Sequence, residues 1–232
     1  MPRDFGMSFK CFDRCNKLNG YNSMNDYTLA ILSVISGVIP VIAAMFNYRQ
    51  IDKKLKIFTA YLLVSFLFDV GFWLASHFGI QNDMPCVHLY LAISLVFFSI
   101  IYYCLFFNTI LKRTTVALAV ITLIALLYNS IKIWTYPSIS NTALSIFLIV
   151  LSLIYFYQLL NRQEYVYIEK QGWFWINAGV LFYSAVNIFI FMLFNQIPSE
   201  LRPKLFMIHS STNIIANLLY STGLLCKPQK TT

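Results

Sequence analysis

The feature that most constrains this chain is a succession of seven apolar runs, each about as long as a bilayer-spanning helix. A transmembrane helix needs roughly 20 apolar residues, because it rises about 1.5 Å per residue through a hydrocarbon core about 30 Å thick. With boundaries good to about four residues, the runs cover 28–47, 56–77, 86–108, 114–134, 139–160, 172–195 and 204–226. They predict an all-α membrane protein, a seven-transmembrane-helix bundle.

Short polar connections separate the runs, and they contain residues that end helices, such as Pro85, Pro137 and Pro198. Short connections make consecutive helices antiparallel neighbours. We therefore expect one transmembrane domain over 28–226, preceded by a disordered tail over 1–27 and followed by a cytoplasmic tail over 227–232.

The basic residues predict the orientation, because short cytoplasmic loops carry an excess of lysine and arginine. Alternate connections and the C-terminal tail hold ten: Arg49, Lys53, Lys54, Lys56, Lys112, Arg113, Arg162, Lys170, Lys227 and Lys230. The other connections hold three: Lys132, Arg202 and Lys204. Counting the first tail with the second group raises three to seven. Both counts favour an N-terminus outside and a C-terminus in the cytoplasm.

Composition excludes several functional classes. Hydrophobic residues make up 59% of the chain and charged residues only 11%, against about 25% charged in soluble domains. The net charge of +8 comes from the flanks of apolar runs, so we expect membrane lipids as partners and no nucleic acid. No polar segment is long enough for a soluble catalytic domain, and no phosphate-binding loop or HExxH motif occurs.

The first 23 residues differ in composition from the rest, with four basic residues and the pair Cys11 and Cys15. They lack the apolar stretch of a cleaved signal peptide. A disordered tail, or an upstream start codon with Met24 as the native start, explains them. A metal or disulfide pair at Cys11 and Cys15 is the alternative.

Polar residues inside the apolar runs are the candidate site residues. In the last run His209, Asn213 and Asn217 recur every four residues, which places them on one side of a helix. Asp69 is the acid well inside an apolar run, where a carboxylate costs about 2.5–3.5 kcal/mol without a partner. Counting residues along each run brings several such groups to similar depth. The complete set is Asp69, Ser94, Asn177, Asn187, His209, Asn213 and Asn217.

Two interpretations of this polar layer stay open. Asparagine and serine commonly join membrane helices by hydrogen bonds, at about 0.6 kcal/mol per pair. Alternatively, the layer binds a ligand or ion or takes part in proton movement, and Asp69 with Ser94 and Asn213 could hold Na⁺ through oxygen ligands.

The sequence also bears on two further kinds of site, a zinc site and a retinal Schiff base. His77, His88 and His209, with Asp83, fall towards the outer end and could hold zinc there, although their spacing matches no helical pair of ligands. The last run contains no lysine beyond its first residue, so a retinal Schiff base there is excluded. We therefore expect no metal and no cofactor.

Several segments resemble a largely uncharacterised family of small seven-transmembrane-helix proteins of Bacteroidetes-type bacteria. They are LSLIYFYQLL (151–160), FWINAGVLFYSAVNIFIF (174–191) and HSSTNIIANLLY (209–220), with HLY at 88–90. The resemblance covers nearly everything after Tyr27. It implies a multi-pass protein of the bacterial inner membrane and a sensory or signalling role. Acidic residues that the family often carries are replaced here by Ser94 and Leu144, so chemistry resting on them is not implied.

Three functions are compatible with these observations. The first is a sensory, signalling or accessory subunit without its own output domain, which would contact a signalling partner through its cytoplasmic loops. The second is an intramembrane enzyme acting on lipid through Asp69 and His209 as acid, base or metal ligands. The third is a small transporter or channel, for which Pro40 within the first run is the main sign.

Overall fold

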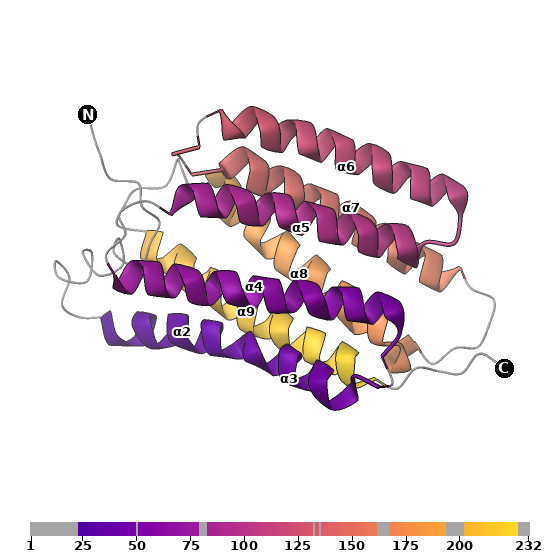
Figure 1. Cartoon of the computed structure of the whole chain (residues 1–232), viewed down its shortest axis with the longest axis horizontal. Helices are drawn as coiled ribbons and strands as arrows, with labels where there is room; N and C mark the ends of the chain where they lie inside the picture. Colours follow the sequence, from indigo (N-terminus) through magenta and orange to yellow (C-terminus); the bar gives the residue numbers. More distant parts are fainter. Residues whose placement is uncertain are drawn as a thin grey trace.

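A computed structural model of the chain describes residues 23–49, 51–78, 83–131, 133–134, 136–161, 168–193 and 202–226. Helices dominate these ranges and no strand occurs in them, in agreement with the predicted all-α class (Figure 1). The helices are α2 (Ser23–Ser36), α3 (Val38–Asn47), α4 (Lys53–His77), α5 (Met84–Leu105), α6 (Thr109–Ser130), α7 (Ser138–Leu160), α8 (Gly172–Leu193) and α9 (Arg202–Leu225), with a short 3-10 turn η1 (Ile168–Lys170).

Six helical segments of the described chain are long and apolar enough to cross a bilayer. They are Thr28–Asn47, Lys53–Ala75, Met84–Leu105, Thr109–Ser130, Ser138–Leu160 and Gly172–Met192. Large apolar side chains on their outer faces remain exposed, as on α6 at Val120, Ile121 and Ile124. Such faces suit lipid rather than water. The chain is a multi-pass helical membrane protein.

The seventh predicted span, α9, is long enough at 24 residues but is not among those six. Its sequence interrupts the apolar run with a histidine, two asparagines, serines and threonines, which lower its hydropathy. In the structure α9 packs along α8 on one side and along α2 and α3 on the other. Its polar residues therefore meet other helices, as a polar stripe at membrane depth requires.

The first span is interrupted at one residue, Gly37, between α2 and α3, where the backbone stays in the right-handed helical region with φ −63° and ψ −21°. Pro40 has no backbone N–H to donate to Ser36, and its ring crowds that carbonyl, which explains a break of one residue just before the proline. Gly37 occupies the break, and the side-chain ring of Phe66 from α4 would lie 3.3 Å from a methyl group placed there. The break thus lies against a neighbouring helix.

Two predicted boundaries differ from the observed ones for local reasons. The fourth span begins at Thr109 rather than 114, because the Asn108 side chain accepts a hydrogen bond from the Ile110 amide at 2.9 Å and caps α6. Lys112 and Arg113 therefore belong to the first turn of α6. The first helix begins at Ser23, inside the segment predicted as a tail.

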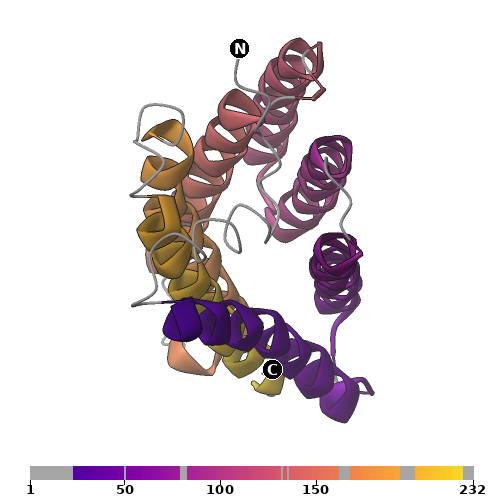
Figure 2. The ribbon, with the colours of Figure 1, turned by 90° about the vertical axis from the view of Figure 1, so that its left-hand side faces the viewer.

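The helices form a ring in chain order, which α9 closes by packing against α2 and α3 (Figure 2). Consecutive helices run antiparallel, so the connections alternate between two ends (Figure 1). At one end the Lys54 Nζ atom lies 4.9 Å from the centroid of the Phe107 ring. The Lys112 Nζ atom lies 5.3 Å from the Tyr103 ring there. We call this end, where α4 and α6 begin, the basic end.

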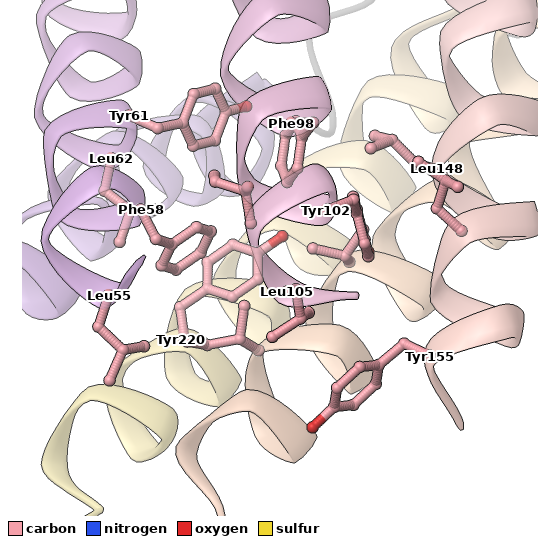
Figure 3. Packing of buried hydrophobic residues seen from close by; sticks show 14 of the residues in the cluster. Leu55, Phe58, Tyr61, Leu62, Phe98, Tyr102, Leu105, Leu148, Tyr155 and Tyr220 are labelled. Atoms are coloured by element: carbon pink, nitrogen blue, oxygen red, sulfur yellow. The ribbon is translucent and has the colours of Figure 1, made fainter. Parts of the chain in front are cut away.

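The apolar core lies towards the basic end (Figure 3). Phe58 is fully buried, and its ring centroid lies 5.3 Å from that of Tyr220 and 6.1 Å from that of Trp173. Helices α8 and α9 approach closely here, because Gly172 and Gly223 face each other without side chains. This half of the bundle is tightly packed.

Some sequence predictions lie outside the described residues. They concern Cys11 and Cys15 with the rest of residues 1–22, the basic residues Lys132 and Arg162, and the tail over 227–232.

Candidate functional site

The polar stripe of α9 makes a series of hydrogen bonds to the broken first span. The Asn213 Nδ2 atom donates to the Ser33 Oγ atom at 3.0 Å. One turn further, the Asn217 Nδ2 atom donates to the Ser36 Oγ atom at 2.9 Å. Ser36 in turn donates to the carbonyl oxygen of Ser33 at 2.6 Å, across the last turn of α2. These bonds fasten α2 to α9, which are the two ends of the ring.

His209 continues the same stripe but contacts α8. Its Nδ1 atom lies 2.6 Å from the Asn187 Oδ1 atom, while the Asn187 Nδ2 atom donates to the Tyr183 carbonyl oxygen at 2.8 Å. The Asn187 Oδ1 atom is then the acceptor, so the Nδ1 atom of His209 carries the proton. In the neutral ring the Nε2 atom keeps its lone pair. Tyr183 and Phe191 flank the ring, with centroids 5.8 and 6.0 Å away.

A cavity of about 270 Å³ lies inside the ring of helices. It extends from the level of Tyr61, Phe98 and Tyr220 to the first turns of α5, α7 and α9, which are at the end opposite the basic end. The polar or hydroxyl-bearing residues that line it are Tyr61, Ser65, Asp69, Tyr90, Ser94, Tyr136, Asn141, Ser145, Tyr183, Ser184, His209, Asn213, Asn217 and Tyr220. The bundle is therefore packed in one half and hollow in the other.

Asp69 lines this cavity from α4. Among the described residues no hydrogen bond or ion pair reaches its carboxyl group. It and His209 line the same cavity, yet no bond joins them. No described group of three or more histidine, cysteine, aspartate or glutamate side chains could hold a metal ion. The acid and the histidine are thus separate functional groups on one cavity wall.

Two serine hydroxyls on the cavity wall also lack partners. Ser94 on α5 and Ser184 on α8 are each only 1% exposed, and neither Oγ atom has a hydrogen-bond partner. Beside Ser94 the Tyr90 hydroxyl lies 2.9 Å from the Ser65 Oγ atom and 3.2 Å from the Tyr61 hydroxyl, and Ser94 interacts with both tyrosines. Both serine Oγ atoms are enclosed, so they belong to the packed wall and do not open onto the cavity.

Asn177 belongs to a different cluster, outside the cavity lining. The Tyr102 hydroxyl donates to the Asn177 Oδ1 atom at 2.8 Å and lies 2.8 Å from the Ser152 Oγ atom. The Asn177 Nδ2 atom donates to the Trp173 carbonyl oxygen at 2.8 Å. All its polar groups are used, so this cluster joins α5, α7 and α8 by interhelical hydrogen bonds.

Of the predicted zinc residues, the His77 side chain lies outside the described part, and His88, His209 and Asp83 do not form one metal-binding group. His209 is bonded to Asn187, whereas His88 is in the first turns of α5, with its Nδ1 atom 3.5 Å from the Ser130 Oγ atom. Asp83 precedes α5, and burial raises the pKa of its carboxyl group.

Sequence reasoning missed part of the cavity wall. Tyr61, Tyr90 and Tyr183 lie within the apolar runs, and the hydropathy pattern does not show that their hydroxyl groups face a cavity. Sequence reasoning also missed Ser33 and Ser36, which do not line the cavity but pair with residues about 180 positions away. The signal that could have located them is the Pro40 break, because a broken span at membrane depth usually lines a cavity.

Comparisons with models of known protein families, with curated proteins and with solved structures found no match for this chain.

Proposed function

We propose that this chain is a sensory subunit of the bacterial inner membrane, which binds a ligand in its intramembrane cavity. The observation that carries the proposal is the cavity itself, because the Asp69 side chain lines it without a hydrogen-bond or ion-pair partner among the described residues. Interhelical bonding alone would leave no reason for such a group. The resemblance to the Bacteroidetes-type family supports the membrane and the sensory role.

The layout of the bundle suggests how occupancy would be transmitted. The cavity adjoins α4, α5, α7, α8 and α9 together with the break at Gly37, so one occupant touches most of the ring. The basic end is tightly packed and presents Lys53, Lys54 and Lys56. With the N-terminus outside, that end faces the cytoplasm. A change in packing around the cavity would alter this surface and be recognised by a partner protein.

Native mass spectrometry of the detergent-purified protein tests the proposal. We expect a co-purified small molecule on the wild type and its loss from His209→Ala and Asn213→Ala. Ser211→Ala is the matched control, because Ser211 is an exposed residue of α9 between these two. Thermal melts of all four proteins accompany the spectra. An unliganded wild type, with both variants simply melting earlier, would contradict ligand binding and leave the stripe with a purely structural role.

A small carrier is the second candidate, and the α2–α3 break favours it. Broken helices at midspan frequently line the substrate sites of transporters, and Gly37 lines this cavity. The two functions differ in flux. Uptake of the co-purified molecule into proteoliposomes would favour the carrier, whereas binding without uptake would favour the sensor.

A further inference from the structure

The charge of the cavity wall restricts its occupant. Among the described lining residues there is one carboxyl group, that of Asp69, and no lysine or arginine. An anion would meet an uncompensated like charge in a low-dielectric setting, which is strongly unfavourable. The wall therefore suits a cation or a neutral molecule.

Asp69 favours the cation. A carboxylate at membrane depth is expensive unless a positive charge or several hydrogen-bond donors stabilise it. The nearby Tyr90 hydroxyl is already paired with Ser65 and Tyr61, and no described side chain pairs with Asp69. An occupant with a positive charge would supply the missing partner.

The aromatic rings of the cavity wall also favour a cation as the occupant. Phe66, Phe72, Tyr90, Phe98, Phe191 and Phe206 all line the cavity. The negative face of an aromatic ring attracts an ammonium group, by about 0.5–2 kcal/mol per ring depending on desolvation. A wall that combines aromatic rings with a carboxyl group is a common way to hold an organic cation.

The volume sets the size. An apolar cavity of about 150 Å³ takes benzene, so about 270 Å³ holds roughly ten non-hydrogen atoms. A single bare metal ion would leave most of that space empty. Building on the proposed binding function, we propose that the cavity binds a small organic amine, whose ammonium group pairs with Asp69 while its apolar part lies against the aromatic rings.

Three probes of similar size and different charge test this assignment at pH 7. They are 2-phenylethylamine, 2-phenylethanol and phenylacetate, titrated by calorimetry and thermal shift against the protein in lipid nanodiscs. We expect the amine to bind at least tenfold more tightly than the alcohol, and phenylacetate not to bind. Asp69→Asn should weaken the amine at least tenfold. Asp52→Asn is the matched control, since Asp52 is exposed ahead of α4 and outside the cavity.

Several results would overturn the assignment: equal binding of amine and alcohol, amine binding unchanged by Asp69→Asn, no binding of any probe, or the same Asp69-dependent stabilisation from sodium chloride alone. The three probes are compared on the wild-type protein, so the test remains valid even if the Asp69→Asn variant misfolds. If native mass spectrometry finds a neutral molecule bound to the protein, the amine assignment is wrong, whereas the proposed binding function still holds. No adduct in the mass spectra would instead count against the binding function itself.

Discussion

The Nδ1 atom of His209 lies 2.6 Å from the Oδ1 atom of Asn187, which joins the polar stripe of α9 to the buried face of α8. The Asn187 Nδ2 atom donates to the Tyr183 carbonyl oxygen, so His209 is the donor in the hydrogen bond between His209 and Asn187. His209 reaches the cavity, and Asn187 lies behind it, fully buried. The asparagine therefore positions the ring and leaves its Nε2 atom for an occupant.

Replacing Asn187 should release this ring. In Asn187→Ala the Nδ1–H group of His209 loses its acceptor, which we expect to destabilise the protein by about 1–3 kcal/mol. Nitrogen NMR of labelled histidine at pH 8 should show the proton on Nδ1 in the wild type and a mixture of tautomers in the variant. A double-mutant cycle with His209→Ala gives the coupling energy. Additive effects with an unchanged tautomer would contradict the assigned bond.

Tyr102 should prove structural and not ligand-binding. Tyr102→Phe removes the hydroxyl shared by Ser152 and Asn177, and a loss of about 1 kcal/mol is expected from interhelical bonds of this kind. Ligand affinity should stay the same, because none of the three residues lines the cavity. Tyr103→Phe is the adjacent control, since Tyr103 is exposed. A large loss of affinity in Tyr102→Phe would place this cluster in the binding site after all.

The helices could be predicted from the sequence because lipid demands long apolar runs, and six of the seven predicted spans meet that criterion in the structure. The polar residues of α9 were visible for the same reason, since His209, Asn213 and Asn217 interrupt such a run. The packing was not predictable. Which residues face Asp69 depends on how α9 closes the ring against α2, and no local pattern encodes that contact.

The close crossing of α8 and α9 should be sensitive to one methyl group. At Gly223 a methyl carbon would lie 2.6 Å from the Gly172 carbonyl oxygen and 2.8 Å from the Ile176 Cγ1 atom. We expect Gly223→Ala to lower stability by about 1–3 kcal/mol, as overpacking does. Gly71→Ala is the matched control, because nothing lies within 4 Å of a methyl group there. Equal melting temperatures for the two variants would argue against the crossing.

Asp83 should make stability depend on pH. Burial raises the pKa of its carboxyl group in the folded protein, and its Oδ1 atom has no partner. Between the unfolded and the folded pKa the unfolded chain has lost the proton while the folded protein keeps it. Stability therefore falls as pH rises through that window and stays lower above it. Asp83→Asn should melt higher than the wild type at pH 7, and the difference should disappear below the unfolded pKa.

Cys86 and Cys104 can decide the orientation of the bundle, because both are exposed and lie near opposite ends of α5. With the N-terminus outside, Cys86 near the start of α5 faces the outer side. In proteins that keep either Cys86 or Cys104, with the other four cysteines of the chain replaced by serine, a membrane-impermeant maleimide added to intact cells should label Cys86. Cys104, at the basic end, should react only after the membrane is opened. The reverse pattern would invert the proposed topology and move the cavity mouth, together with any ligand that it binds, to the cytoplasmic side.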